Sequence, residues 1–257
     1  MTEPGVRTRR EDAVGWLEFN RPPHNVFTPQ MIEDVLAALA ELEADPAVRV
    51  IVIGSALPAH FSAGADLALF ADLDTATLGR WIARVHQVVR ALRRSTKPLL
   101  AAVGGAAVGG GLEMTFHCDV RFAAEDARLG LPEVRIGFIP PLGSSLALPH
   151  LLGRQGALRF LYEGAMIPAS QAHTLGLVDT LVPPAELHAR VQAYGTDLAG
   201  KPPEALAAIR RCIAAGPDAA FEAALQLEYD TALALVQTEN FREGVRAFLE
   251  KRKPVWR

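Results

Sequence analysis

The feature that most constrains the fold is a repeated order of short apolar strands and amphipathic helices. Val48–Ile53 is a nearly continuous β-branched run, typical of a strand covered on both faces. Leu99–Val103 is a second apolar strand, and Val14–Asn20 alternates apolar and polar residues as a half-buried strand does. Thr28 and Pro29 open a helix with one apolar face. This order predicts an α/β fold built from repeated strand-strand-helix turns.

Later in the chain the pattern becomes mainly helical. A helix is predicted near Leu112–Cys118, followed by short strands at Val120–Ala123 and Arg128–Gly130. The helices predicted after this point, separated by Pro and Gly breaks, are Gln155–Tyr162, Ala169–Leu175, Ala185–Ala199, Glu204–Ala214 and Ala219–Leu249. We therefore expect the last third to serve packing, subunit contact or closure over a site.

Composition excludes several classes of function. The net charge of -3 gives no argument for nucleic-acid binding. Cys118 and Cys212 are far apart, which argues against a disulfide framework and a zinc site. No apolar run reaches the length of a membrane span, and the N-terminus lacks a signal core. We expect a cytoplasmic protein with no membrane partner.

Two segments rich in small residues are candidates for close backbone approach to a ligand. They are Phe61–Leu67 and Gly104–Gly111, and the second lies between a predicted strand and a predicted helix. Amides at a helix start suit an anion, but Gly111 is not followed by the Lys-Ser/Thr pair of a phosphate loop. An oxyanion site is the better functional interpretation, and a purely structural turn is the alternative.

Two acids follow in unusual settings. Glu113 comes just after the glycines, and Glu133 follows Leu131-Pro132. Each lies in an apolar segment punctuated by Gly or Pro, where a solvated charge is unexpected, although single glutamates at such places are usually solvated. The pair is a candidate for general acid–base chemistry.

A serine nucleophile is the weaker alternative. Ser144-Ser145 with His117 or His150 would supply the residue types, but nothing in the sequence brings them together. The seven histidines show no ligand spacing, so no metal site is predicted.

Taken together, these segments resemble the enoyl-CoA hydratase/isomerase (crotonase) family over nearly the whole chain. The matching strings, in order, are Asn20-Arg21-Pro22, FSAGADL at Phe61–Leu67, KPLLAAVGGAAVGGGLE at Lys97–Glu113, CDVRFAAEDARLGLPEVRIGFIP at Cys118–Pro140, GLVD at Gly176–Asp179 and EGVRAFLEKRKP at Glu243–Pro254. Each string is weak evidence, whereas their order and spacing are specific.

The resemblance implies an enoyl-CoA hydratase, a lyase whose site holds a thioester. The amides of Ala65 and Gly110 would form the oxyanion hole, Glu113 would activate water, and Glu133 would exchange a proton at the α-carbon. Further substrate contacts are expected at Ala63, Asp66, Leu67, Pro132, Pro141 and Lys251. No cofactor is expected, because coenzyme A is part of the substrate.

The family's architecture implies two regions and an oligomer. Residues 1–190 would form the crotonase-type spiral core with the acyl-CoA site, and residues 191–257 a helical trimerisation region. A homotrimer, or a hexamer of paired trimers, is the expected assembly. The segment around Lys251 resembles one that reaches coenzyme A bound to a neighbouring subunit.

Two departures bear on the reaction. Pro141 stands where family hydratases commonly have glycine, so one amide donor is missing, and the double proline Pro140-Pro141 is similar to cyclic dienoyl-CoA hydratases. Ala68 stands where relatives often carry lysine. The residues that either line an acyl pocket or pack in the core are Leu69, Phe70, Leu73, Leu78 and Trp81.

The same residues are compatible with two other functions. Double-bond isomerisation would use the same oxyanion hole, and a non-catalytic acyl-CoA-binding homologue would keep the fold. The presence of both glutamates favours an enzyme.

Overall fold

Two β-sheets form the centre of the structure, a computed structural model that describes residues 5–70, 74–215 and 218–255. The larger sheet has the strand order β1-β2-β3-β5-β7-β10, with a β1/β2 hairpin and parallel pairing elsewhere. Its strands are β1 (Val6–Glu11), β2 (Val14–Phe19), β3 (Val50–Ser55), β5 (Leu99–Val103), β7 (Val120–Ala124) and β10 (Thr180–Val182). The smaller sheet contains β4 (His60–Ser62), β6 (Ala106–Val108), β8 (Arg128–Gly130) and β9 (Ile167–Pro168).

The chain passes from one sheet to the other and then into a helix in each turn of a spiral. β3 is followed by β4 and α2, β5 by β6 and α3, and β7 by β8 and α4. Parallel neighbours in both sheets require such crossovers. The predicted α/β fold of strand-strand-helix turns is confirmed.

Helices cover the sheets and make up the last third of the described chain. The α-helices are α1 (Pro29–Ala44), α2 (Thr75–Arg94), α3 (Gly110–Thr115), α4 (Ser144–Glu163), α5 (Ala169–Leu175), α6 (Leu187–Ala199), α7 (Pro203–Ala215), α8 (Asp218–Val236) and α9 (Glu239–Leu249). Three short 3-10 helices are η1 (Leu67–Phe70), η2 (Glu133–Ile136) and η3 (Pro184–Glu186). Thr28 caps α1 as predicted, accepting a hydrogen bond from Met31 N at 3.2 Å.

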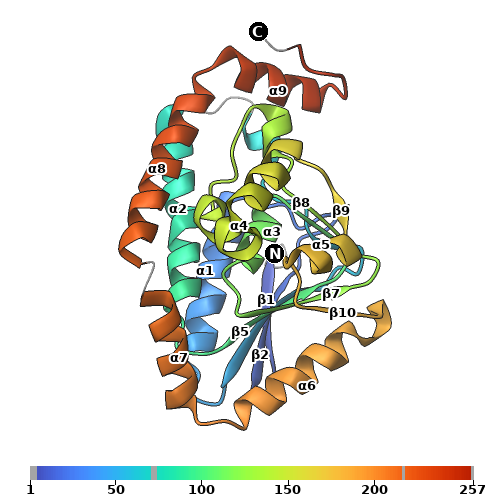
Figure 1. The fold of residues 1–257 in the computed structure, drawn as a ribbon, viewed down its shortest axis with the longest axis vertical. Coiled ribbons are helices and arrows are strands. Elements are labelled where there is room, and N and C mark those ends of the chain that lie inside the picture. The colour runs from blue at the N-terminus through green and yellow to red at the C-terminus, as the bar shows by residue number, and fades with distance from the viewer. Residues whose placement is uncertain (1–4, 71–73, 216–217, 256–257) are drawn as a thin grey trace.

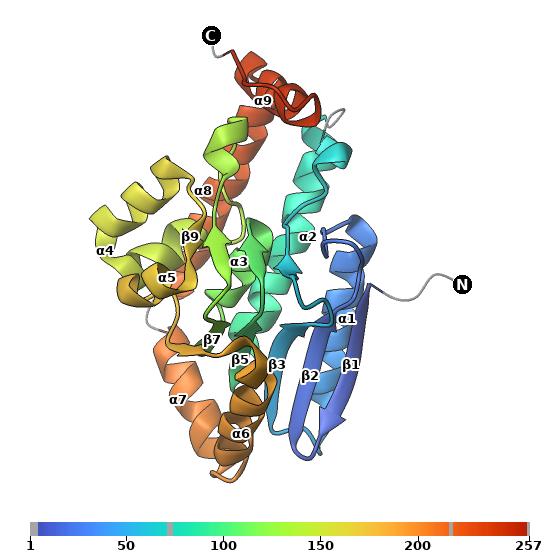
Figure 2. The same ribbon diagram turned by 90° about the vertical axis from the view of Figure 1, so that its right-hand side faces the viewer.

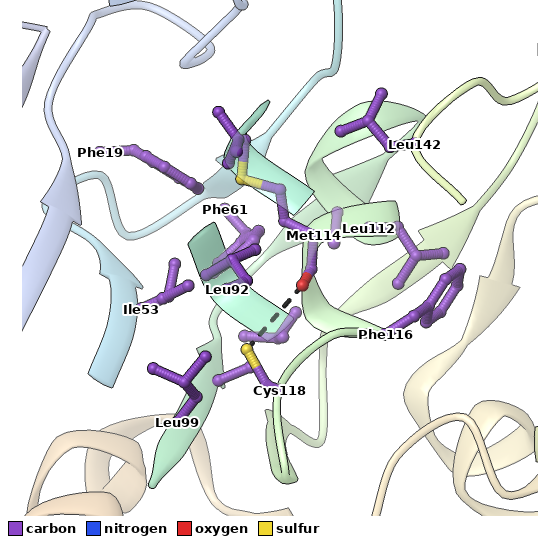
Figure 3. Packing of buried hydrophobic residues seen from close by; sticks show 14 of the residues in the cluster. Phe19, Ile53, Phe61, Leu92, Leu99, Leu112, Met114, Phe116, Cys118 and Leu142 are labelled. Atoms are coloured by element: carbon purple, nitrogen blue, oxygen red, sulfur yellow. Dashed lines mark hydrogen bonds between the residues drawn. The ribbon is translucent and has the colours of Figure 1, made fainter. Parts of the chain in front are cut away.

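The central strands of the large sheet are buried on both faces, as the β-branched run at β3 predicts. Every residue of β2 is buried too, so the half-buried strand predicted at Val14–Asn20 is wrong in that respect. Val50 and Val52 belong to the cluster that α6 covers, whereas Ile51 and Ile53 belong to the main core on the other face. Each such side chain contributes roughly 1.5–3 kcal/mol on burial. Figure 3 shows the main core around Met114, whose carbonyl accepts a weak hydrogen bond from the buried Cys118 thiol at 3.8 Å.

The C-terminal helices pack on the core of the same chain. α8 runs alongside α2, and α9 lies across the end of the molecule against η1 and η2 (Figures 1 and 2). Position 190/191, the predicted boundary between core and C-terminal region, falls inside α6, and Val191 of α6 is fully buried on the large sheet. The predicted trimerisation role of residues 191–257 stays a prediction.

Two predicted helix boundaries are wrong. The single helix predicted at Ala219–Leu249 is interrupted, because the Thr238 hydroxyl accepts from Phe241 N at 3.1 Å and starts α9 afresh. The helix predicted from Gln155 begins at Ser144, with a break in helical geometry at Gly153. Both errors arise where a polar cap or a glycine overrides the apolar periodicity.

Candidate active site

An apolar cavity of about 340 Å³ brings together most of the residues singled out in the sequence. Its walls are the loop after β4, the start of α3, η2 and the segment before α4. Phe248 of α9 also lines it. The predicted site residues on its wall are Ala63, Ala65, Leu67, Gly110, Glu113, Pro132, Glu133 and Pro141. Cavities of this size and character are the usual location of ligand sites.

The two segments rich in small residues touch each other at this cavity. Gly64 has a φ of 81°, and a Cβ on it would lie 3.0 Å from Val108 O and 3.4 Å from Gly110 N. Glycine is therefore needed for the close approach as well as for the backbone conformation. Ala65 and Gly110 both line the cavity, and the oxyanion hole predicted from their amides stays a prediction.

Asn25 is hydrogen-bonded to the first of these segments, and it is a site residue that the sequence did not predict. Its side chain is fully buried, and Nδ2 donates to Phe61 O at 3.0 Å and Ser55 Oγ at 2.8 Å. Its backbone carbonyl accepts from Ser62 Oγ at 2.7 Å, and that hydroxyl in turn accepts from Gly64 N at 3.1 Å. The only sequence signal was a polar residue in the proline-rich break, which is ordinary for a turn.

Glu113 lies in the first turn of α3 with no exposed surface. Its Oε1 accepts from Leu142 N at 2.8 Å and from Ser144 Oγ at 2.7 Å, whereas its buried Oε2 has no hydrogen-bond partner. Burial raises the pKa of Glu113 well above its ordinary value, and the charges of Glu133 and Glu228 raise it further. One oxygen of this carboxyl group is thus left for a ligand.

Glu133 begins η2 and faces the same cavity. Its Oε2 is also buried without a hydrogen-bond partner, and burial raises its pKa to about 7. Because the charge of Glu133 raises the pKa of Glu113, the two groups titrate as a pair. Near neutral pH such a pair holds a proton that one member can give while the other accepts.

Two predicted substrate contacts lie away from the described cavity wall. Asp66 accepts from Ala68 N at 3.3 Å and is 4.0 Å from the Arg21 guanidinium. Lys251 is exposed just after α9. Both roles stay predictions, since coenzyme A would extend beyond the acyl cavity.

Of the residues predicted either to line an acyl pocket or to pack in the core, some line the cavity and others do not. Phe70 and Trp81 line the cavity and stack edge to face with ring centroids 5.2 Å apart. Leu78 is fully buried in the core cluster behind them, and Leu69 is 46% exposed. Leu73 lies outside the described residues.

The hydrogen bonds of the two serines argue against the serine-nucleophile alternative. Ser144 and Ser145 donate their hydroxyls to Glu113 and Glu228. His117 is buried after α3, as predicted for a packed residue, and its Nε2 donates to Leu142 O at 2.7 Å rather than facing a serine. Burial lowers the pKa of His117 to about 4, so the ring stays neutral.

The described residues contain neither a metal-binding cluster nor a membrane-spanning helix. Among them, no group of three or more His, Cys, Asp and Glu side chains has the geometry to hold a metal ion. None of the helices in this part of the chain has the length and apolar character needed to span a membrane.

The spiral of two sheets, with paired carboxyl groups on an apolar cavity, defines an enzyme of the crotonase fold. A sequence profile described as enoyl-CoA hydratase/isomerase matches residues 9–257, and the chain belongs to this family. A probable enoyl-CoA hydratase of Bacillus subtilis is 35% identical over 246 residues, covering 94% of each chain. A crotonyl-CoA hydratase of Syntrophomonas wolfei is 32% identical over 254 residues, covering 98% of each.

Solved structures agree in fold. An enoyl-CoA hydratase from Mycobacterium avium subsp. paratuberculosis superposes with a TM-score of 0.88 at 30% identity, covering 98% of both chains. An enoyl-CoA hydratase from Bacillus halodurans reaches a TM-score of 0.90 over 95% of this chain and 99% of that one, at 23% identity. The predicted fold class and family are confirmed.

Proposed function

We propose that the protein is an enoyl-CoA hydratase, a lyase that adds water across the 2,3-double bond of an enoyl-CoA thioester. The observation that carries the proposal is the pair Glu113 and Glu133, each with one buried, unpartnered oxygen on a single apolar cavity. Related proteins named as hydratases, which are lyases, support it. We propose no cofactor, because coenzyme A belongs to the substrate.

The reaction follows from the chemistry of a conjugated thioester. Water adds to the β-carbon, and the electron pair moves onto the thioester oxygen, which the Ala65 and Gly110 amides would stabilise. A preorganised donor of this kind is typically worth about 3–4 kcal/mol of the barrier. Glu113 takes the proton from water, and protonated Glu133 gives a proton to the α-carbon. The coupled pair then redistributes its proton before the next turnover.

The test is a spectroscopic assay with crotonyl-CoA, longer linear enoyl-CoA and cyclic enoyl-CoA thioesters. Hydration removes the ultraviolet absorbance of the conjugated thioester, so the signal should decay with enzyme concentration. Binding of acyl-CoA without any turnover of the panel would favour a non-catalytic homologue.

Pro141 favours a second candidate, double-bond isomerisation. It lines the cavity and has no amide hydrogen to hold a water molecule, and isomerisation needs only proton transfer. A 3-enoyl-CoA substrate would then gain conjugated absorbance. Activity confined to cyclic dienoyl thioesters would instead support the likeness in the Pro140-Pro141 pair.

We also propose a homotrimer, or a hexamer of paired trimers, and a cytoplasmic location. The family resemblance supports the assembly, and the two isolated cysteines, which fit a reducing compartment, support the location. Phe248 of α9 lines the cavity of its own chain, so this part of the acyl site would come from the same subunit. Light scattering of the purified protein measures the assembly.

A further inference from the structure

Glu228 is a buried carboxyl group that the proposed reaction does not use. It projects from α8, is 4% exposed, and lies at the start of α4. Its Oε2 accepts from Gly143 N at 2.9 Å, and its Oε1 accepts from Ser145 N at 3.0 Å and from the Ser145 hydroxyl. Residue 143 is a glycine and offers no side-chain cap of its own. The carboxyl group of Glu228 therefore caps α4 from another helix.

The same turn supplies both hydrogen bonds that Glu113 receives. Leu142 N and Ser144 Oγ donate to Glu113, whereas the residues next to them, Gly143 and Ser145, donate to Glu228. Four consecutive residues thus point their donors alternately at two buried acids. A change in the hydrogen bonds of Glu228 can therefore alter those of Glu113 through this turn, in addition to the direct effect of its charge.

Two carbonyl groups at the start of the turn accept hydrogen bonds from buried histidines. His86 of α2 donates to Pro141 O at 2.8 Å, and His117 donates to Leu142 O at 2.7 Å. Burial lowers the pKa of both rings, so both stay neutral around pH 7. The turn therefore keeps its donors in place through the neutral range.

Three other charged groups on α8 or on elements near it form ion pairs that do not involve Glu228. Arg90 of α2 pairs with the exposed Glu222 of α8, Arg210 of α7 pairs with Asp119, and Glu243 of α9 pairs with Arg252. The first turn of α4 carries no acidic residue. Glu228 is thus the group on α8 whose charge acts on Glu113.

We infer that Glu228 is a positioning residue for Glu113. It fixes the Leu142–Ser145 turn so that both donors engage Oε1 of Glu113, and Oε2 alone is presented to the cavity. The inference rests on the proposed function for its kinetic consequences. Burial raises the pKa of Glu228 itself, and its ionised form favours the protonated form of Glu113, since like charges oppose ionisation.

The first test compares Glu228→Gln with Glu222→Gln on the same helix. The glutamine keeps the size of the side chain, but its amide nitrogen cannot accept from Gly143 N. We expect kcat for E228Q to fall at least about tenfold with KM changed less than about threefold. E222Q makes the same chemical change on an exposed residue and should stay within about twofold of the parent.

Two readouts separate positioning from mere stabilisation. Loss of the Glu228 charge lowers the pKa of Glu113, so the limb of the pH–rate profile that reports Glu113 should move to lower pH in E228Q. The double variant with Ser144→Ala should be less impaired than the product of the single effects, because both changes act on Glu113 through one turn. An unmoved limb and multiplicative effects would overturn the inference.

A third readout does not depend on turnover. A carbon-13 titration of glutamate carboxyl groups, with the Glu113 signal identified by its loss in E113Q, should show a lower midpoint in E228Q. If no thioester is converted, the proposed function fails, and this midpoint still decides the inference. Should E228Q not fold, Ser145→Ala removes one donor to Glu228 and should lower the kcat severalfold; parental kcat and an unchanged midpoint would overturn the inference.

Discussion

The Glu133 carboxylate occupies the space that any side chain at position 109 would need. A Cβ on Gly109 would lie 2.8 Å from Glu133 Oε1, well inside van der Waals contact, and Gly109 has a φ of 52°. The glycine that precedes α3 therefore also leaves room for an acid that follows it by more than twenty residues. Packing between these two segments builds the site.

Replacing Gly109 with alanine should damage activity far more than stability. The methyl group displaces Glu133, and misplacing a catalytic group by about 1 Å can cost roughly 10²-fold in rate. The positive φ should cost on the order of 1 kcal/mol of unfolding free energy. Gly153→Ala is the matched control, because Gly153 has a φ of 67° and no atom within 4 Å of a built Cβ. Urea unfolding and turnover of both variants measure the difference, and equal activities would contradict it.

Glu113→Gln and Glu133→Gln should each reduce kcat for hydration by about 10²–10⁴-fold, because neither amide can transfer the required proton. The double variant should be little worse than the worse single variant, since the two groups act as a unit. Stopped-flow absorbance measures these rates, with E222Q as a folded control. Near-parental turnover in both single variants would refute the acid–base assignment.

The contribution of the buried glutamates to stability should fall as the pH rises from about 4.5 to 7, opposite in sign to the contribution of the buried, neutral His117. Burial raises the pKa of Glu133 from 4.5 to about 7, and the pKa of Glu113 is raised as well. At these two carboxyl groups the folded state therefore holds more protons than the unfolded chain in this window, so the contribution is complete below pH 4.5 and is lost by about pH 7. For Glu133 alone the loss is up to about 3 kcal/mol.

Glu133→Gln removes the Glu133 part of this titration and leaves the histidine contribution in place. The unfolding free energy at pH 7.5 minus that at pH 5, from urea titrations, should be more positive in E133Q than in the parent chain. E222Q should keep the parental slope. An identical slope in E133Q would show that the group is not protonated in the folded state.

The ion pair between Arg121 and Asp179 should matter for stability and leave the chemistry alone. The Arg121 side chain is 7% exposed, and Asp179 accepts from both its backbone N at 2.7 Å and its guanidinium at 3.1 Å. Asp179→Asn leaves a buried cation poorly paired and should cost about 2 kcal/mol. Glu163 forms an exposed ion pair with Arg159, and Glu163→Gln should lower the unfolding free energy by less than about 0.5 kcal/mol. Thermal unfolding compares the two, and kcat should be unchanged in both.

Local pattern was sufficient for most of the fold. The β-branched run at β3 and the Thr28-Pro29 start of α1 identified their elements because burial and capping leave a direct mark on nearby residues. The helix predicted across Thr238 failed, because one hydroxyl bonded to a backbone amide outweighs apolar periodicity over a turn. The start of α4 was missed for a related reason, since its cap comes from Glu228 on another helix.

The sequence by itself determined the order of strands and helices and, through the family resemblance, the positions of Glu113 and Glu133. Only the tertiary structure decided that Glu228 and Asn25 support the site, because their hydrogen-bond partners lie 85 and 36 residues away along the chain. A single glutamate in a helix, or an asparagine in a turn, leaves no local signal of such a role. Its burial and its partners exist only once distant segments pack together.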